Sequence, residues 1–568
     1  MRLSQPVTQG GQTFLHRMRM LGQIIRLASF FSAVLALLVF GTSCYLTFSE
    51  KHIDQYILAW HARFIQYFWG PHEIFQRYRV SYFVQSTKPL LKWVHQKLLF
   101  HITVGLLVGL VLFILIFIVW TRQGAHAHKK TIIAGSSIQP KKVVMKMIYR
   151  NRKASHLNLM GLPLIKDTET QHILITGTTG SGKTNAFNHM MNQTEGQKTV
   201  IVDFNGEFAK RFYDQACDTI MNPFDKKFPG WDLFEECRES YHFDDLAESL
   251  IPHSGHDLFW TQSARTVLSA VLNVLSKTHQ TSIGDILEMV NTMPLAELHK
   301  KLSKTKAAVL LDPKNEKTAI SIRMNVAAHI ACLESLIGEH KNPLSIRRWI
   351  QDDSEGGRLF LTATPAQRAT LRPLISCWVS IAIKSLMECE PDHHRRLWFM
   401  IDELPSLHKL TDLSLCLAEG RKYGACMVLG FQNIPQLEEL YGPRITQSLV
   451  DLCGTKIMFR CASFEMAEKL SRLIGTQERQ ELQEGISFGA HEMRDGVSLN
   501  LQTKEKLVIP PYNLTSIKDL TSYVQLPQGY PITKIEWDLA KAPEKQPDNN
   551  DQKKAMPEEN AQMETKSP

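Results

Sequence analysis

A short stretch of glycines, hydroxyls and one lysine is the part of this 568-residue chain best suited to chemistry. Gly177-Thr-Thr-Gly-Ser-Gly-Lys-Thr184 has the spacing G-x-x-x-x-G-K-[ST]. The apolar run 172–176 before it predicts a buried strand, and residues 185–191 after it predict a helix. Glycines let successive backbone N–H groups surround a phosphate, and a helix N-terminus adds its positive dipole end. The pattern predicts a nucleotide-binding loop, with a glycine-rich turn as the alternative.

Within this loop we expect Lys183 to reach the β- and γ-phosphates of ATP and Thr184 to hold Mg²⁺. The remaining residues are expected to bind the phosphates mainly through their backbone, and they are Gly177, Thr178, Thr179, Gly180, Ser181 and Gly182.

Two adjacent carboxylates supply the acidic partner that such a loop needs. Leu397-Trp-Phe-Met-Ile-Asp-Glu403 begins with apolar residues that predict a fully buried strand, expected to neighbour the strand before the loop. Asp402 then falls at the carboxyl end of that strand and can reach the Mg²⁺ shell. Glu403 is placed to orient or deprotonate an attacking water, which favours hydrolysis over passive binding. The alternative is a solvated strand end.

Further short apolar runs separated by helical stretches predict a mostly parallel α/β sheet, and they are 199–202, 358–361, 426–430 and 456–460. Gln432 follows the third run and is expected to sense the γ-phosphate or hold the water, unless it only forms a turn. Arg421 is a candidate arginine finger for the nucleotide of a neighbouring subunit. Its alternative is a surface arginine paired with Glu419 or Glu438.

Two long runs without a charged side chain precede these motifs, at residues 27–48 and 98–121. At 1.5 Å per residue they span about 33 and 36 Å, enough to cross a bilayer as helices. A cleaved signal peptide is the alternative for the first run. It is disfavoured because the run exceeds the usual apolar core and Gly-Thr-Ser-Cys at 41–44 makes a poor cleavage site.

The net charge of +9 is unevenly distributed, because residues 1–153 carry +17 and residues 154–568 carry −8. Basic residues flank both apolar runs on the sides of residues 1–26 and 122–153, where no acid occurs. This bias predicts that both termini lie in the cytoplasm of a multi-pass inner-membrane protein. The ten cysteines include no C-x-x-C pair, which favours free thiols in a reducing compartment.

Several further segments, together with the nucleotide motifs, resemble the TraD type of type IV coupling protein, the inner-membrane ATPase of conjugative DNA transfer. The resemblance extends from about residue 170 to 530. The segments are Asp203-Phe-Asn-Gly-Glu-Phe208, Met221-Asn-Pro-Phe224, Trp231-Asp-Leu233, Phe259-Trp-x-x-Ser-Ala-Arg265, Glu316-Lys-Thr-Ala-Ile-Ser-Ile-Arg323, Asp402-Glu-Leu-Pro-Ser-Leu-His-Lys-Leu410, Arg421-Lys-Tyr-Gly424, Gly430-Phe-Gln432 and Met493-Arg-Asp-Gly-Val-Ser498.

The resemblance implies a RecA-like P-loop motor that forms a homohexamer and is interrupted by an all-α domain. It also implies the roles proposed above, including Gln432 as sensor and Arg421 as the arginine acting in trans. The implied organisation is a cytoplasmic N-terminus (1–26), a transmembrane helix (27–48), a periplasmic loop (49–97), a second transmembrane helix (98–121), a basic connector (122–160), the nucleotide-binding domain (161–238 and 345–538), the all-α domain (239–344) and a disordered tail (539–568).

The implied function is to pump single-stranded DNA, with its bound relaxase and DNA-processing complex, into a type IV secretion channel through that channel's inner-membrane components. One alternative keeps the fold but recruits protein effectors, and another makes the ring a receptor platform in which nucleotide turnover is incidental. An ABC transporter is disfavoured because no L-S-G-G-Q-like segment occurs, and a chromosome-segregation translocase fits the segments less well. The tail is far shorter than the docking extension of large family members, so its docking role stays open.

Overall fold

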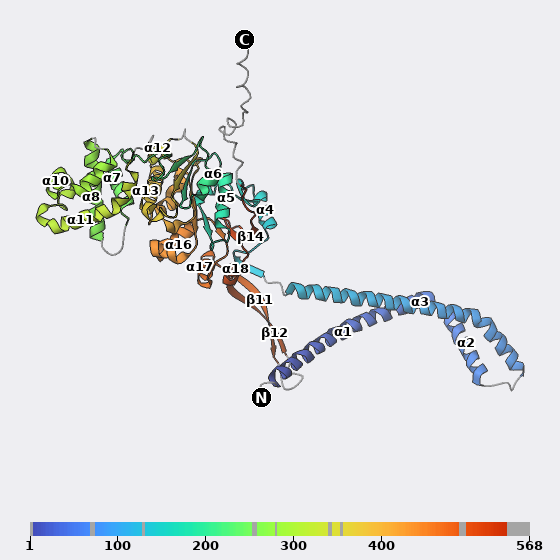
Figure 1. The fold of residues 1–568 in the computed structure, drawn as a ribbon. Coiled ribbons are helices and arrows are strands. Elements are labelled where there is room, and N and C mark those ends of the chain that lie inside the picture. Colours follow the sequence, from blue (N-terminus) through green and yellow to red (C-terminus); the bar gives the residue numbers. More distant parts are fainter. Residues whose placement is uncertain are drawn as a thin grey trace, which may run out of the picture. The chain divides into compact units, whose positions relative to one another are not determined.

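The structure is a computed structural model that describes residues 4–68, 74–127, 131–252, 258–278, 281–338, 343–352, 356–487 and 496–541. The chain divides into two compact units (Figure 1). The first comprises Met1–Thr131 and Gln480–Thr503, and the second comprises Ile132–Arg479 and Lys504–Pro568. The predicted tail lies outside the described residues from position 542 onward, as do residues 493–495 of one family segment.

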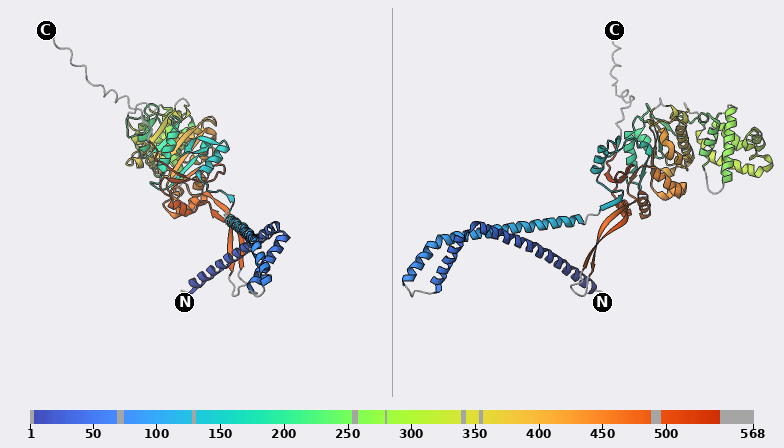
Figure 2. Two further views of the ribbon diagram at one scale, coloured as in Figure 1. Left: turned by 90° about the vertical axis from the view of Figure 1, so that its right-hand side faces the viewer. Right: turned by 180° about the vertical axis from the view of Figure 1, so that it is seen from behind.

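Three helices make up most of the first unit: α1 (Ser4–Thr47), α2 (Glu50–Phe68) and α3 (Ile74–Ala127). Two stretches within them, Met18–Thr47 and Tyr82–Gln123, are long and apolar enough to cross a membrane. Parts of α1 and α3 lie side by side (Figure 2).

Small residues allow α1 and α3 to approach closely. A Cβ at Gly109 would lie 3.0 Å from the Ser32 carbonyl oxygen and 3.1 Å from the Ala36 Cβ, and a Cβ at Gly105 would lie 2.8 Å from the Ala36 carbonyl oxygen. Gly105 and Gly109 form a G-x-x-x-G pair, which is a common contact of membrane helices.

The second unit is built on a nine-stranded sheet in the order β14-β13-β10-β4-β9-β8-β5-β7-β6. The seven strands from β10 to β6 are parallel, and β13 and β14 are added antiparallel at one edge. The strands are β4 (Ile173–Thr176), β5 (Thr199–Asp203), β6 (Thr219–Met221), β7 (Arg358–Thr362), β8 (Leu397–Ile401), β9 (Ala425–Phe431), β10 (Thr455–Met458), β13 (Thr521–Gln525) and β14 (Thr533–Glu536).

The sheet confirms the predicted mostly parallel α/β architecture, and one expectation about it was wrong. We expected the strand that carries Asp402 to neighbour the strand before the nucleotide loop. Instead β9 lies between β4 and β8 and pairs with both. Sequence order does not fix this, because parallel strands need crossover connections that can pass over a neighbour.

Both faces of the sheet are covered, because alternate residues of its central strands point into two separate cores. In β8, Leu397, Phe399 and Ile401 join one core, whereas Trp398 and Met400 join the other. The second core is covered by α4 (Lys141–Arg150), α5 (Lys183–Gln193) and α6 (Glu207–Phe212). The first core is covered by α13 (Arg368–Met387), α14 (Leu413–Glu419), α15 (Ile434–Tyr441), α16 (Pro443–Leu452) and α17 (Phe464–Ile474).

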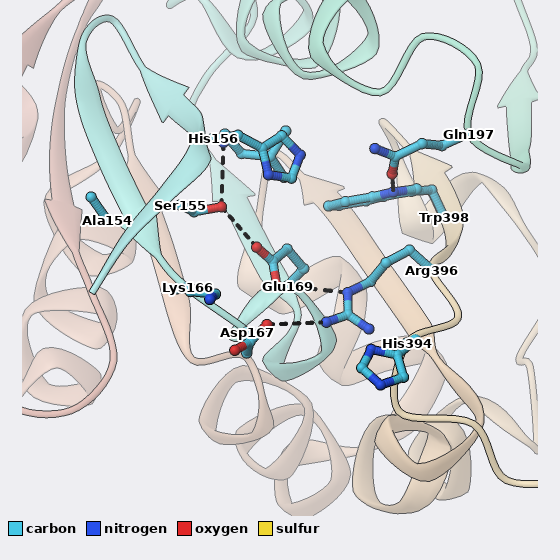
Figure 3. A pocket seen from close by; sticks show the side chains of 11 residues that line it. Ala154, Ser155, His156, Lys166, Asp167, Glu169, Gln197, His394, Arg396 and Trp398 are labelled. Atoms are coloured by element: carbon cyan, nitrogen blue, oxygen red, sulfur yellow. Dashed lines mark hydrogen bonds and ion pairs between the residues drawn. The ribbon is translucent and has the colours of Figure 1, made fainter. Parts of the chain in front are cut away.

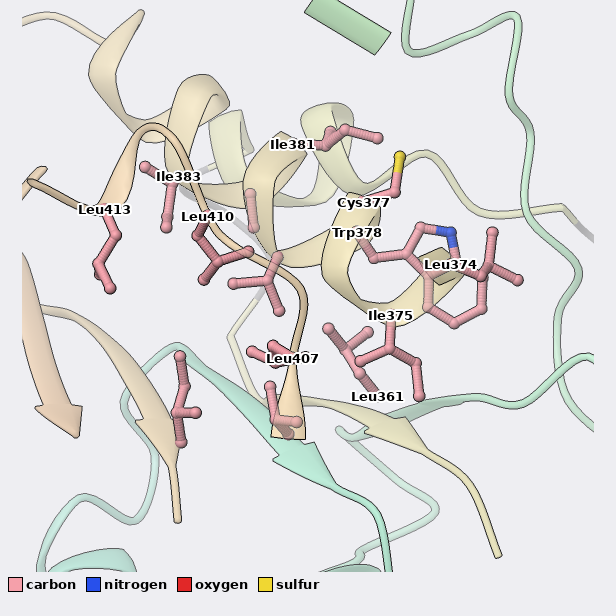
Figure 4. Close-up of a cluster of buried hydrophobic side chains, with 14 of the residues drawn as sticks. Leu361, Leu374, Ile375, Cys377, Trp378, Ile381, Ile383, Leu407, Leu410 and Leu413 are labelled. Carbon is pink, nitrogen blue, oxygen red and sulfur yellow. The ribbon is translucent and has the colours of Figure 1, made fainter. Parts of the chain in front are cut away.

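Helix α13 is central to the first core. Its Leu374, Ile375 and Trp378 side chains pack close to Leu361 of β7 and to Leu407, which follows the Asp402-Glu403 pair (Figure 4). All of these side chains are fully or almost fully buried. The packing therefore supports the segment that carries both carboxylates from behind.

A helical insertion separates β6 from β7, and its described residues contain no strand, as the fold class predicted. Its helices are α7 (Ser240–Leu250), α8 (Leu258–Lys277), α9 (Ile283–Leu287), α10 (Leu295–Lys301) and α11 (Glu316–Ile330), after which α12 (Ile346–Gln351) leads back to the sheet. The buried Glu236 carboxylate links the segment that enters the insertion with the segment that leaves it. It accepts hydrogen bonds from Trp231 Nε1 (3.0 Å) before the insertion and from the Arg347 backbone N–H (2.8 Å) after it.

The remaining elements were not predicted. They are the hairpin of β2 (Ala154–Leu159) and β3 (Leu162–Ile165), the sheet β1-β11-β12 of β1 (Thr131–Gly135), β11 (Thr476–Ser487) and β12 (Gly496–Leu507), and the short helix α18 (Pro511–Ser516). All ten cysteines lie among the described residues, and none of them forms a disulfide bond.

Candidate nucleotide site

The predicted loop, residues 177–184 and called the phosphate loop below, joins the end of β4 to the start of α5. Gly177 and Gly182 have φ angles of +157° and +117°. A Cβ at position 177 would lie 2.6 Å from the Cβ of Phe459, so only glycine fits against this buried ring. The loop is therefore shaped by its backbone against Phe459, the residue after β10.

The Lys183 side chain lies over this loop. It is 6% exposed, and its Nζ donates a hydrogen bond to the Gly177 carbonyl oxygen at 2.9 Å. Burial lowers the pKa of the Lys183 ammonium, while the nearby Glu403 and Asp402 carboxylates oppose that shift. A buried cation held among carboxylates suits the binding of a polyphosphate, which brings compensating negative charge.

Thr184 and Asp402 are in contact although β4 and β8, the strands that precede them, are not neighbours in the sheet. Thr184 Oγ1 donates a hydrogen bond to Asp402 Oδ2 at 2.9 Å. The other carboxylate oxygen, Oδ1, is buried and has no hydrogen-bond partner among the described residues. Burial raises the pKa of Asp402. A hydroxyl beside an unsatisfied carboxylate oxygen fits Mg²⁺, which takes few protein ligands and completes its shell with phosphate and water.

A glycine on the intervening strand makes this meeting sterically possible. A Cβ at Gly430 of β9 would lie 2.1 Å from the Asp402 carbonyl oxygen and 3.0 Å from the Phe187 ring. Any side chain at position 430 would therefore displace the segment that carries Asp402.

Gln432 connects the phosphate loop with Glu403. Thr179 Oγ1 donates a hydrogen bond to Gln432 Oε1 at 2.8 Å, and the Gln432 side chain also hydrogen-bonds the Glu403 carboxylate. Burial raises the pKa of Glu403, while Lys183 and Gln432 oppose the shift. The arrangement brings an acid and an amide to the edge where Lys183 lies, and such a pair is able to orient a water.

Arg421 does not reach this site within its own chain. It lies exposed in the short 3₁₀ helix Gly420–Tyr423, just before the N-terminal end of β9. Since β9 runs parallel to β4, Arg421 stands at the opposite edge of the sheet from the phosphate loop. The seven residues of β9 separate the two edges by about 23 Å.

Arg421 is a surface residue, but within the described part of the chain no ion pair joins it to Glu419 or Glu438, which the alternative named as its partners. Glu419 pairs with Lys422 (3.6 Å) and Glu438 pairs with Lys469 (2.8 Å). Of the eight expected phosphate-loop residues and the four others, Arg421 alone lies away from the site.

Two residues at this edge were not assigned a role by sequence reasoning. Phe459 shapes the phosphate loop, and no sequence pattern marks a lone aromatic residue after a strand for that task. Asp203, at the end of β5, accepts hydrogen bonds from the backbone N–H groups of Glu207 (3.1 Å) and Ala209 (2.9 Å). It therefore fixes the start of α6, and its negative charge adds to the rise in the pKa of Asp402.

A separate polar cavity of about 280 Å³ lies where β8 begins, away from the phosphate loop (Figure 3). Arg396 crosses it to pair with Asp167 (3.6 Å) and Glu169 (3.7 Å), and Trp398 Nε1 donates to Gln197 Oε1 (2.6 Å). These acids and bases neutralise one another, so the cavity does not compete with the phosphate loop for a nucleotide.

Comparisons with known proteins agree with this geometry. Residues 156–538 match the family model described as the type IV secretion-system coupling protein DNA-binding domain. The chain is 31% identical over 557 residues to the coupling protein TraD of Escherichia coli strain K12. The aligned region covers 94% of this chain and 77% of TraD.

Solved structures of the plasmid coupling protein TrwB share the fold. Its complex with the GTP analogue GDPNP has a TM-score of 0.66 at 28% identity, and its complex with ADP and Mg²⁺ has a TM-score of 0.65 at 27% identity. Each comparison covers 74% of this chain and 97% of the other. The likeness confirms the predicted RecA-like P-loop fold.

Proposed function

Because this chain belongs to the coupling proteins of type IV secretion systems, we propose that it hydrolyses ATP with Mg²⁺ to move single-stranded DNA into a secretion channel. The observation that carries the proposal is the bridge from Thr184 to Asp402, with Glu403 and Gln432 beside it. A protein that only bound nucleotide would not need a buried acid held beside the magnesium ligands.

In this proposal, residues 177–182 bind the phosphates through their backbone, and Lys183 neutralises the β- and γ-phosphates. Thr184 and Asp402 hold Mg²⁺, which stabilises the charge that develops during phosphoryl transfer. Glu403 accepts the proton of the attacking water, and its raised pKa suits a group that must exchange a proton. Gln432 orients that water and links its position to the phosphate loop.

We propose that the active form is a ring of six copies, in which Arg421 of one copy completes the site of the next. The placement of Arg421 at the opposite edge of the sheet supports action in trans. The relaxase bound to the DNA would be the accompanying protein cargo.

The proposed location is the bacterial inner membrane, with both termini in the cytoplasm and residues 49–97 in the periplasm. The two apolar stretches and the basic residues beside them support this topology. In this orientation, the inner-membrane components of a secretion channel would contact the protein at its two membrane-spanning helices.

The test compares Lys183→Ala and Glu403→Gln with Glu439→Gln, which changes an exposed carboxylate on α15. We expect the first two variants to lose DNA-stimulated ATP turnover and DNA transfer by at least 100-fold, about the size of a general base or charge-stabilising group. Membrane insertion should be unchanged, and Glu439→Gln should behave as wild type. Normal DNA transfer by Lys183→Ala would contradict the motor, and transfer of protein without DNA would favour the effector alternative.

A further inference from the structure

After β14, the chain runs over the outer face of α5, the helix that begins with Lys183. Asn185 Nδ2 and His189 Nε2 contact the Asp538 carbonyl oxygen at 2.9 and 2.8 Å, and the Ala540 backbone N–H donates to Asn185 Oδ1 at 2.8 Å. One turn further on, Asn192 Nδ2 donates to the Lys541 carbonyl oxygen at 3.1 Å. Residues 537–541, called the strap below, are thus anchored along α5.

The α5 side of this contact recognises backbone. Positions 185, 189 and 192 follow helical spacing and so share one face of α5. Each of their hydrogen bonds goes to a main-chain carbonyl or N–H group of the strap, while the Leu539 side chain is 73% exposed. Arg211 of α6 adds a further hydrogen bond to the Ala540 carbonyl oxygen. The face therefore fits an extended peptide and holds it by several weak bonds that can be broken one after another.

The strap also reaches the phosphate loop from behind through ring contacts. Trp537 is 4% exposed, and its ring centroid lies 5.6 Å from that of Phe459 and 5.7 Å from that of His189. Phe459 is the residue on which Gly177 and Gly182 are packed.

A backbone connection runs in parallel with these rings. The Leu520 backbone N–H donates to the Ser181 carbonyl oxygen at 2.9 Å, and the Trp537 backbone N–H donates to the Leu520 carbonyl oxygen at 2.8 Å. The first residue of the strap is therefore two hydrogen bonds away from the phosphate loop.

We propose that the strap is a coupling device that links the C-terminal segment of the chain to nucleotide affinity. When it is seated on α5, Trp537 and Phe459 hold the phosphate loop in its nucleotide-binding form. Release of the strap from α5 lowers nucleotide affinity. By thermodynamic reciprocity, bound nucleotide holds the strap more tightly.

The proposal goes beyond DNA transport and depends only on the phosphate loop, so it can be tested without DNA. One pair of proteins is truncated after Trp537 or after Lys541. A second pair keeps the full chain and carries either His189→Ala with Asn192→Ala, or Asn188→Ala. Asn188 is the matched control because it lies on α5 and its side chain has no hydrogen bond to the strap among the described residues.

Two quantities are measured on the detergent-solubilised protein: the Kd for fluorescently labelled ADP with Mg²⁺, and the hydrogen-exchange rate of the Ala540 amide. We expect truncation after Trp537 and the double variant each to raise the Kd by about fivefold or more. Truncation after Lys541 and Asn188→Ala should leave it unchanged. ADP should slow exchange at Ala540 in the wild-type protein and not in the double variant.

An equal Kd for the two truncations would overturn the coupling. If the shorter truncation does not fold, the full-length double variant decides, because an unchanged Kd together with faster exchange at Ala540 also overturns it. Unchanged exchange at Ala540 in the double variant would show that His189 and Asn192 do not help to hold the strap beside Asn185, and the proposal would fail at that step.

Discussion

At the scale of single residues, burial is the common cause of the shifted pKa values at the site. Burial raises the pKa values of Asp402 and Glu403 and lowers that of Lys183. In each case the charged form is disfavoured until an opposite charge arrives. The three groups are therefore poised for a ligand that carries both phosphate and Mg²⁺, and this is the physical basis of the proposed catalysis.

The placement of Arg421 leads to a mixing experiment. Lys183→Ala and Arg421→Ala proteins should each be inactive in the ATPase assay. If Arg421 acts in trans, mixed rings contain some interfaces with an intact Lys183 on one side and an intact Arg421 on the other. We therefore expect partial recovery of ATP turnover when the two proteins are co-assembled.

Recovery should require both partners, so mixing Lys183→Ala with Glu403→Gln serves as the control. Those two residues lie in one site of the same chain, and a mixed ring gains no intact site. The absence of recovery with Arg421→Ala would assign that residue to a structural role.

His172, which precedes β4, gives the fold a pH dependence of its own. Its Nε2 lies 3.0 Å from the Leu417 carbonyl oxygen, and its Nδ1 accepts from the Met427 N–H at 3.3 Å. Burial lowers the pKa of His172 from 6.5 to about 4. Between pH 6.5 and about 4, His172 is therefore protonated in the unfolded chain and neutral in the folded chain. Stability from this group is complete above pH 6.5 and falls by about 3 kcal/mol as the pH drops to 4.

We expect the melting temperature of His172→Gln, measured between pH 7 and 4, to fall less steeply than that of the wild-type protein. The comparison must be made between the two proteins, because burial raises the carboxyl pKa values of Asp203 and Glu236 and so acts in the opposite direction. Parallel curves for both proteins would rule out His172 as a contributor.

At the scale of elements, the position of β9 between β4 and β8 organises the site. This strand brings Gln432 between the phosphate loop and Glu403. Its Gly430 leaves room for the Asp402 backbone. One inserted strand thus supplies the candidate sensor and the clearance that the candidate magnesium ligands Thr184 and Asp402 need.

The close contact between helices α1 and α3 predicts that Gly109→Leu destabilises their packing. The added side chain would meet Ser32 and Ala36, so the two helices must separate, at a cost of about 1–3 kcal/mol. We expect faster proteolysis within residues 49–97 of the detergent-solubilised protein. Gly41→Leu is the matched control, since no atom lies within 4 Å of a Cβ at that position. Equal rates for the two variants would contradict close packing at Gly109.

At the scale of the whole molecule, the net charge of +9 is no evidence for DNA binding. Residues 1–153 carry +17, and the rest of the chain carries −8. The excess of basic residues lies near the apolar spans, where it suits an anionic membrane surface. A DNA-binding surface must therefore be a local basic region on an acidic body.

We accordingly expect binding of single-stranded DNA to be tolerant of sequence and sensitive to salt. Each phosphate contact should steepen the fall of log K with log salt by about 0.7. Fluorescence anisotropy with two unrelated strands, at several salt concentrations, measures both properties. Strong preference for one strand, or a slope near zero, would contradict contacts made mainly to phosphates.

The sequence by itself determined that a phosphate loop follows a buried strand and that the acidic pair Asp402-Glu403 ends another one. These motifs carry their meaning in local spacing, because backbone donors, a helix N-terminus and a strand end are all set within a few residues. For the same reason the two apolar stretches and the parallel sheet were predictable.

Only the tertiary structure decided which strands are neighbours, what lies behind the phosphate loop and where Arg421 stands. It placed β9 between β4 and β8, set Phe459 beneath Gly177, and brought Asp538 onto Asn185, more than 300 residues away in the chain. Such contacts depend on crossover topology and side-chain packing between distant segments, and no local pattern in the sequence encodes them.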